Sequence, residues 1–244
     1  MQASGWLRAD WPAPVAVRAF CTTRSGGVST GPWASLNLGE HCGDEPDSVR
    51  RNRARLSRSL PAAPLWLRQV HGARVVRHSG RAALPPEADA AVAFETGQVC
   101  AVLTADCLPV FLCDRAGTRI AVAHAGWRGL AAGVLEATVS ELGGAPGELL
   151  AWLGPAIGPA AYEVGGDVVA ALAAGPGPDL SPAFLPRGDR WLLDMYLAAR
   201  LQLAHAGVTS VHGGGLCTFS DPARFFSFRR DGVTGRMASV IWLE

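Results

Sequence analysis

The amino-acid sequence predicts a single α/β domain of the mixed, α+β-like kind, with a largely antiparallel sheet flanked by helices. Short strand-like runs are interspersed with helical stretches, without the strict alternation of a parallel doubly wound sheet. No G-x-G-x-x-G motif follows the first strand-like run, and no Walker loop is present. The composition, 49% hydrophobic and 18% charged, is that of a compact protein. We therefore expect one domain over residues 1–244, although this length would also accommodate two small domains.

The strands are predicted from short runs rich in Val, Ile and Leu. These runs lie at residues 15–21, 73–78, 99–103, 109–113, 119–124, 149–153 and 239–243. Because the predicted helices do not separate them regularly, neighbouring strands are expected to pair mostly antiparallel.

The helices are predicted from apolar residues recurring at helical spacing. They cover residues 47–60, 128–142, 167–173 and 189–206. Asp47 is the expected N-cap of the first, and glycines close the second and the last. Residues 173–186 are rich in Gly and Pro and are expected to form a surface loop.

Charge and cysteine content limit the functional classes. The net charge of +1 provides no overall field for nucleic acid or an anionic membrane. Residues 1–12 are polar and charged, and no apolar run has the length of a membrane span. Six scattered cysteines do not form a secreted disulfide framework. We expect a cytoplasmic protein with small-molecule partners, neither nucleic acid nor membrane, and an undetermined oligomeric state.

Three segments place a metal-binding residue type beside a predicted strand, which is where catalytic groups are often presented. They are Arg68-Gln-Val-His71-Gly, Thr104-Ala-Asp-Cys107-Leu-Pro and Ala123-His124-Ala-Gly-Trp-Arg-Gly. Two His and one Cys would hold Zn²⁺ and leave the fourth position for water or substrate. The alternative is a small buried cysteine with two hydrogen-bonded core histidines. A closed, four-ligand structural zinc is a further alternative.

The same residues also suit chemistry without a metal. Cys107 would be a thiolate nucleophile and His124 its base, with Asp106 or a backbone carbonyl orienting the histidine. This arrangement predicts a cysteine hydrolase or deamidase. The sequence does not separate the two readings, because a metal-binding cysteine and a nucleophilic cysteine both need a lowered pKa.

Anion-binding residues are predicted around the same site. The helix expected from residue 128 begins just after His124, so its free N–H groups would face the site. Arg128 would add a bidentate contact to a phosphate or carboxylate. Arg24 lies in a Gly-containing loop with several hydroxyls, residues 22–29, although an ordinary hairpin turn explains that loop equally well. Asn37, in the stretch Asn37-Leu-Gly-Glu-His41, is added to the expected substrate- and phosphate-binding residues.

Five segments resemble the YfiH-type family, also called the laccase-domain or peptidoglycan editing factor family. They are RQVHGARVV, DAAVAFETGQVCAVLTADCLPVFL, AVAHAGWRGLAAGV, LGPAIGPAAYEVG and FFSFRRDGVTGRMASVIWL. The resemblance runs in order from about residue 22 to residue 243, which is nearly the whole chain.

The resemblance implies a fold similar to the catalytic domain of cytotoxic necrotising factor. It implies a metal on His71, Cys107 and His124, with Zn²⁺ expected and Cu²⁺ as the alternative ion. It also implies purine nucleoside phosphorylase activity on adenosine, inosine, guanosine and methylthioadenosine, with accessory adenosine deaminase activity. Members of the family are described as well as copper-dependent polyphenol oxidases and as editing factors that remove serine from peptidoglycan precursors.

The residue types in the sequence favour some of these activities over others. A multicopper oxidase needs a ligand set dominated by histidines, and this chain has six histidines with no His-x-His pair. Phosphorolysis needs an anion site, which Arg24 and Arg128 would supply. The leading hypothesis is therefore a zinc-dependent purine nucleoside phosphorylase. The alternatives are a metal-independent amidase that edits serine-containing peptidoglycan precursors, with Cys107 as nucleophile, and a copper-dependent polyphenol oxidase.

Overall fold

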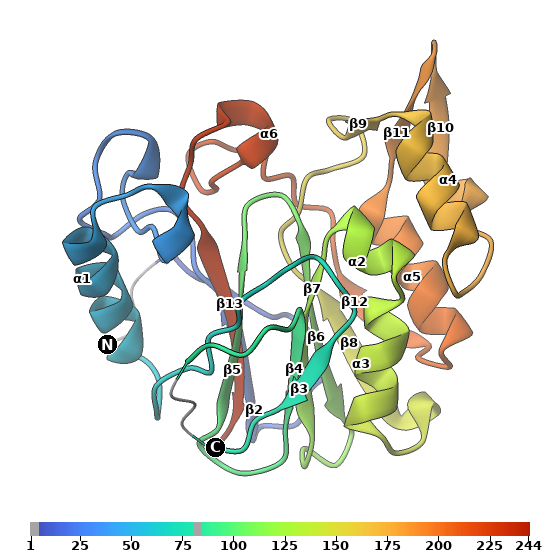
Figure 1. Cartoon of the computed structure of the whole chain (residues 1–244). Helices are drawn as coiled ribbons and strands as arrows, with labels where there is room; N and C mark the ends of the chain where they lie inside the picture. Colours follow the sequence, from blue (N-terminus) through green and yellow to red (C-terminus); the bar gives the residue numbers. More distant parts are fainter. Residues whose placement is uncertain (1–4, 81–83) are drawn as a thin grey trace.

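The computed structural model describes residues 5–80 and 84–244, so the first four residues of the polar N-terminal stretch lie outside it. The chain forms one mixed α/β domain (Figure 1). The strands are β1 (Leu7–Arg8), β2 (Val17–Cys21), β3 (Val75–Arg77), β4 (Ala90–Ala93), β5 (Val99–Thr104), β6 (Leu108–Asp114), β7 (Ile120–Ala125), β8 (Leu149–Leu153), β9 (Glu163–Val164), β10 (Phe184–Arg187), β11 (Arg190–Leu193), β12 (Ser210–Gly213) and β13 (Met237–Leu243). The helices are α1 (Pro46–Ser57), α2 (Trp127–Ala131), α3 (Val134–Leu142), α4 (Gly166–Ala174), α5 (Met195–His205) and α6 (Phe228–Asp231), with single 3-10 turns η1 (Gly31–Trp33), η2 (Glu40–Cys42), η3 (Pro146–Glu148) and η4 (Ser181–Ala183).

Two sheets form the centre of the domain. The larger has the strand order β12-β8-β6-β7-β4-β3 and the smaller β1-β2-β13-β5, while β10, β11 and β9 form a separate small sheet. Most pairings are antiparallel, as predicted, and β12 with β8 and β3 with β4 are the parallel pairs. The strands predicted from Val, Ile and Leu runs are all present, with small shifts at their ends.

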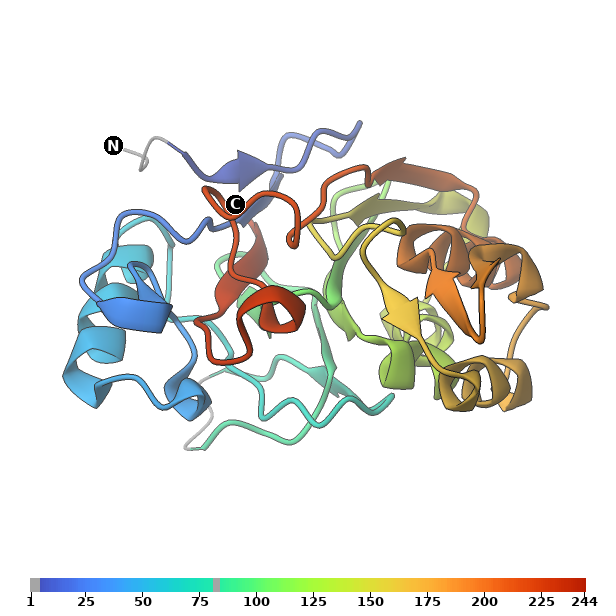
Figure 2. The same ribbon diagram turned by 90° about the horizontal axis from the view of Figure 1, so that it is seen from above.

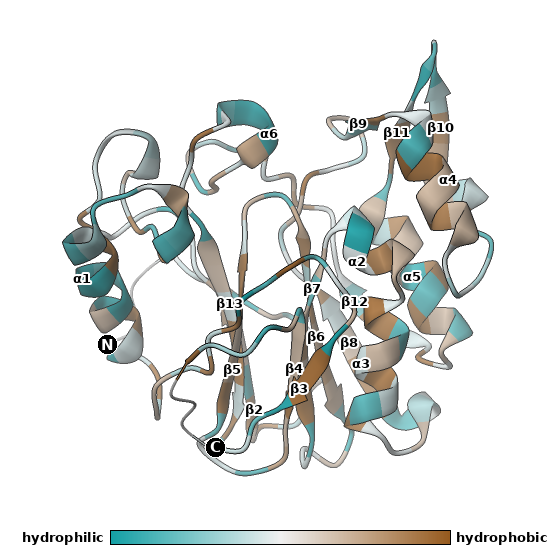
Figure 3. Cartoon of the chain, viewed as in Figure 1, coloured by the Kyte–Doolittle hydropathy of each residue, from teal (hydrophilic) through white to brown (hydrophobic). Residues whose placement is uncertain are grey.

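The core lies on both sides of the larger sheet. Alternation along β5 turns Cys100 and Val102 toward Phe111 and Val122 of the larger sheet. The opposite face of the smaller sheet packs against Leu56 of α1. The other face of the larger sheet is covered by α2, α3 and α5 (Figures 1 and 2). In Figure 3 the strands at the centre of the domain are mostly white to brown, whereas much of α1 is teal and therefore hydrophilic.

The helix predictions need three corrections. The helix expected over residues 128–142 is two helices, because Gly133 takes the left-handed conformation with φ of 80° between α2 and α3. The helix expected over residues 189–206 begins only at Met195, where the Asp194 side chain accepts from the Leu197 N–H as N-cap. Its first residues form β11 instead.

Asp47 lies in the first turn of α1 rather than at its N-cap, which is Glu45. The loop expected over residues 173–186 includes η4 and the start of β10. None of the helices within residues 5–80 and 84–244 combines the length and apolar character needed to cross a membrane. The similarity to the cytotoxic necrotising factor fold stays a prediction.

Candidate metal centre and active site

His71, Cys107 and His124 come together at one end of the larger sheet. His71 lies in the loop before β3, Cys107 in the turn between β5 and β6, and His124 near the end of β7. The antiparallel register of β6 and β7, with Pro109 opposite His124, brings the start of β6 next to the end of β7. The three ligand atoms all lie within 4.8 Å of one another.

The geometry of this cluster fits a small transition-metal ion. The Cys107 Sγ lies 3.9 Å from His71 Nε2, and the rings of His71 and His124 are 4.8 Å apart in an edge-on arrangement. Metal–ligand bonds of about 2.0–2.3 Å at tetrahedral angles place ligand atoms about 3.3–3.8 Å apart, so small shifts would complete the site. Among the described residues the group has three members, and His71 is exposed while His124 is buried. The centre therefore has an open side for a fourth ligand.

Asp89 organises two of the three ligands. Its fully buried carboxylate accepts from His124 Nδ1 at 2.9 Å, which leaves the Nε2 of that ring for the metal. The same carboxylate accepts the backbone N–H groups of His71 at 2.9 Å and Gly72 at 2.7 Å. These bonds fix the His71 loop, where His71 itself has a φ of 61°. Burial raises the pKa of Asp89, but hydrogen bonds from His124 and the backbone lower it overall.

The orienting group for His124 is therefore Asp89, not Asp106 or a backbone carbonyl as expected. Asp106 accepts from Thr218 Oγ1 at 2.6 Å, from Ser227 Oγ at 3.0 Å and from the backbone N–H of Arg229 at 2.7 Å. Asp106 thus ties the 218 loop and α6 to the residue next to Cys107. It is a positioning residue for the wall of the site.

Cys107 and His124 strongly affect each other's protonation. Burial raises the pKa of the Cys107 thiol, but His124 and His71 together lower it to about 6. Burial lowers the pKa of His124, but Cys107 and Asp89 raise it to about 9. At neutral pH the free pair is accordingly a thiolate beside an imidazolium. The thiolate is the form that binds a metal or attacks a substrate.

The predicted anion-binding residues have different surroundings. Arg24 donates to the carbonyls of Ala34 and Pro222 and lies over the Phe226 ring, 4.7 Å from its centre. Arg128 is exposed at the start of α2 and lies over the Trp127 ring at 4.3 Å.

Asn37 is different, because it is buried and all four hydrogen-bonding positions of its amide are occupied. Its nitrogen donates to the carbonyl of Gly39 and to Asp44, and its oxygen accepts the N–H groups of Gly39 and Arg236. The structure therefore gives Asn37 a role in shaping the 37–44 loop, with no group left to hold phosphate.

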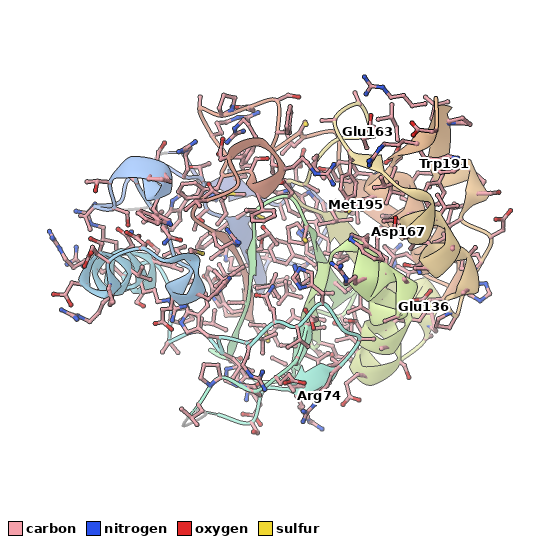
Figure 4. All side chains as sticks on the ribbon, turned by 45° about the horizontal axis from the view of Figure 1, so that its top comes forward. Arg74, Glu136, Glu163, Asp167, Trp191 and Met195 are labelled. Carbon is pink, nitrogen blue, oxygen red and sulfur yellow. The ribbon has the colours of Figure 1, made fainter. Side chains whose placement is uncertain are left out.

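A pocket of about 520 Å³ adjoins the metal centre. Its lining residues are Trp127, Tyr162, Glu163, Val164, Gly165, Asp167, Val168, Asp189, Arg190 and Arg229. His71, Cys107 and His124 are not among these lining residues, but Trp127 follows Gly126, whose added Cβ would lie 2.8 Å from Cys107 Sγ, and the Arg229 backbone N–H donates to Asp106. The Arg229 guanidinium lies over the Tyr162 ring at 4.9 Å, and burial raises the pKa of that phenol. Figure 4 shows Glu163 and Asp167 on the same side of the molecule as Trp191.

Fold and site together define a mixed α/β protein with a candidate His-Cys-His metal centre. The model of the family described as multi-copper polyphenol oxidoreductase laccase matches residues 18–244. The chain belongs to this laccase-domain family, as its motifs predicted.

Named relatives and solved structures agree with this assignment. A purine nucleoside phosphorylase of Pseudomonas aeruginosa is 56% identical over 243 residues, 99% of this chain and 99% of that protein. Purine nucleoside phosphorylase YfiH of Escherichia coli is 54% identical over 236 residues, 96% of this chain and 97% of that protein. A crystal structure of a Neisseria meningitidis protein superposes with a TM-score of 0.94 at 50% identity, covering 99% of this chain and all of that one. YlmD from Geobacillus stearothermophilus does so at 0.91 and 34%, covering 100% of this chain and 98% of that one.

Proposed function

We propose that this protein is a zinc-dependent purine nucleoside phosphorylase that cleaves adenosine, inosine, guanosine and methylthioadenosine with phosphate, and that it also deaminates adenosine. The observation that carries the proposal is the open His71, Cys107 and His124 cluster beside a pocket with aromatic and arginine side chains. The names of the relatives support it. The proposed partners are small molecules in the cytoplasm, where the six free cysteines would stay reduced.

Each group has a proposed part. His71, Cys107 and His124 would hold the ion, which supplies Lewis-acid activation of a substrate oxygen when bound. Trp127 and Tyr162 line the pocket with Arg128 and Arg229 over one face of their rings, so a purine base would stack against the other face. Asp167, at the start of α4, offers carboxylate oxygens to the ribose hydroxyls.

The proposed attraction of phosphate toward the site falls to arginines that have no carboxylate partner among the ion pairs of the described residues. Arg24 and Arg229 donate to backbone carbonyls, the Asp231 carboxylate offsets part of the Arg24 charge, and Arg128 is exposed beside Trp127. An arginine without a counter-ion attracts phosphate more strongly than one in an ion pair.

The test pairs elemental analysis of the purified protein with an assay for free base released from adenosine and inosine. Stoichiometric zinc with release that depends on phosphate is the expected result. Cys107→Ala should lose both metal and turnover, whereas Cys113→Ala, at a buried thiol on β6 outside the cluster, should keep both. A metal-free Cys107→Ala protein with full activity would contradict the proposal. Deamination is read separately, as inosine formed from adenosine without phosphate.

A second candidate, the cysteine amidase acting on peptidoglycan precursors, is favoured by the alignment of Cys107, His124 and Asp89. The thiol and imidazole interact directly, and Asp89 accepts from the other ring nitrogen at 2.9 Å, as in a nucleophile–base–acid triad. The discriminating measurement is mass spectrometry of the metal-stripped protein with substrate. A covalent adduct on Cys107 and retained turnover would favour the amidase.

The third candidate, copper-dependent polyphenol oxidation, has less support. Within residues 5–80 and 84–244, one group of three or more metal-binding residue types was found, whereas multicopper oxidation needs several copper ions. Phenol oxidation by the copper-loaded protein, compared with the zinc-loaded protein, tests it.

A further inference from the structure

We infer that Arg236 and His41 form a phosphate site on the wall of the metal centre opposite the Trp127 and Tyr162 pocket. This inference rests on the proposed function and adds the place where its second substrate binds. Arg236 precedes β13 and His41 lies in η2. In Figures 1 and 2 the blue segment carrying η2 lies on one side of α6, while β9, α4 and β11 lie on the other.

The Arg236 side chain is held in a fixed position. Its backbone N–H donates to Asn37 Oδ1 at 2.9 Å, and one guanidinium nitrogen donates to the carbonyls of Thr234 and Gly235 at 3.0 Å each. Its stem packs directly on Gly39, where an added Cβ would lie 2.8 Å from the Arg236 Cγ. A guanidinium already anchored in this way loses little conformational freedom when it binds an anion.

The charge of Arg236 has no carboxylate partner among the ion pairs of the described residues. The neighbouring Arg53 is neutralised by Glu40, whose carboxylate lies 2.7 Å away. The nearby Asp44 carboxylate is occupied by Ser29, Asn37 and the N–H of Glu45. Net positive charge therefore remains at Arg236.

His41 connects this charge to the metal centre. Its side chain is exposed, and no side-chain hydrogen bond to it is seen in the described part of the chain. Burial lowers the pKa of His41, and the charges of Arg236, Arg53 and His124 lower it further, against a smaller opposite effect of Glu40. Gly39, two residues before His41, packs on the Arg236 stem, and Arg236 precedes Met237, which pairs with Thr104 at the end of β5 shortly before Cys107. His41 and Arg236 therefore lie on the β5 side of the metal centre.

Two further contacts connect Arg236, through α6, to the residue next to Cys107. The Arg236 guanidinium faces the Phe228 ring of α6 at 5.9 Å, and the next residue, Arg229, donates its N–H to Asp106 beside Cys107. The metal centre is thus flanked by an aromatic pocket on one side of α6 and a cationic wall on the other.

This arrangement matches the needs of phosphorolysis. A phosphate oxygen forms a bond to C1′ of the ribose while the C1′–N bond to the base breaks. The bonding pair leaves with the base, and the proton of hydrogen phosphate ends on the base nitrogen. In a direct displacement the attacking oxygen and the leaving base lie on opposite sides of C1′. Phosphate at Arg236 and His41, with the base against Trp127 and Tyr162, satisfies this requirement.

The test uses zinc-loaded protein and inorganic phosphate as the probe. Phosphate binding is measured by calorimetry, and KM values for phosphate and for inosine are measured separately. Arg236→Gln should weaken phosphate binding and raise the phosphate KM by about 10- to 100-fold, and His41→Gln by about 10-fold, with zinc content unchanged and the inosine KM within about twofold. Arg200→Gln is the matched control, since Arg200 is also held by two carbonyls, those of Val211 and Gly213 on β12.

Unchanged phosphate binding in folded Arg236→Gln and His41→Gln proteins would overturn the inference, as would a wild-type protein that does not bind phosphate. If Arg236→Gln does not fold, Arg236→Lys and His41→Gln carry the test. Wild-type protein that binds phosphate at these residues but releases no base would sink the proposed function and leave the anion site standing.

Discussion

His124 Nδ1 donates to the Asp89 carboxylate across 2.9 Å, and neither side chain is more than 4% exposed. The contact follows from strand register. Ala90 of β4 pairs with Ala123 of β7, so the residues that flank this pair, Asp89 and His124, meet at the end of the sheet. A carboxylate behind a metal-binding imidazole fixes the ring orientation and raises its basicity.

Replacing Asp89 by Asn should weaken metal binding about 10- to 100-fold, because an amide keeps the size but loses the negative charge that favours the His124 ligand. It should also weaken the hold on the His71 loop. Zinc affinity measured by chelator competition checks this, with circular dichroism to confirm folding. Wild-type zinc affinity in the folded variant would contradict the role of Asp89.

Gly126 packs closely against Cys107 and His71. An added Cβ would lie 2.8 Å from Cys107 Sγ and 3.2 Å from a ring carbon of His71. The φ of Gly126 is −74°, so alanine fits the backbone and the clash alone decides the effect. Gly126→Ala should lower zinc occupancy and turnover together. Gly147→Ala, with no atom within 4 Å of the new Cβ, should leave both unchanged.

Asp106 has a φ of 90°, which asparagine tolerates, so Asp106→Asn tests its hydrogen bonds rather than its backbone. The Asp106 carboxylate accepts hydrogen bonds from the Thr218 and Ser227 hydroxyls and from the Arg229 backbone N–H. Replacing the carboxylate by an amide weakens these bonds and should reduce the free energy of unfolding by about 2 kcal/mol. Urea denaturation measures this. The control is Asp47→Asn, whose exposed ion pair with Arg50 should contribute less than about 0.5 kcal/mol. Equal effects of the two substitutions would refute the assignment.

Glu136 on α3 (Figure 4) has two buried carboxylate oxygens with no hydrogen-bond partner among residues 5–80 and 84–244, and burial raises its pKa. The folded protein therefore holds this proton more tightly than the unfolded chain. The resulting contribution to stability is fully present below the unfolded-state pKa and is lost as the pH rises through the folded-state pKa.

Glu136→Gln should accordingly stabilise the protein at pH 7.5 by on the order of 1 kcal/mol and have little effect near pH 4. Unfolding free energies of variant and wild type at both pH values give the comparison. Glu141→Gln, an exposed position on the same helix, is the control. A difference that does not change with pH would rule out the ionisation of Glu136 as its cause.

The sequence singled out His71, Cys107 and His124, which the structure brings together, because His and Cys are metal-binding residue types wherever they occur. The sequence gives no such indication for Asp89, because a single aspartate before an alanine-rich segment cannot be distinguished from an exposed surface residue. Its role depends on the pairing of β4 with β7, which no local pattern specifies.

The missed strands have related causes. Residues 90–93 read Ala-Ala-Val-Ala, with one β-branched residue and no alternation of apolar and polar residues, and tertiary burial on both faces makes them β4. Residues 190–193 continue the apolar spacing of the following helix, so the sequence pattern predicts one helix across both segments. In the structure the N-cap Asp194 separates β11, which pairs with β10, from α5. Asn37 differs from the expectation because its amide is fully used by hydrogen bonds within the 37–44 loop and to the backbone of Arg236.

The place of β13 has a consequence for the order of assembly. This strand, which is made after every other strand, is inserted between β2 and β5 and is hydrogen-bonded to both. Until then β5, which leads directly to Asp106 and Cys107, has an open edge during synthesis. The nascent chain therefore carries a reactive thiol with no finished scaffold around it. The surroundings of Cys107 are therefore complete only once β13 has paired with β5, so binding of an ion there is expected to follow the insertion of this strand.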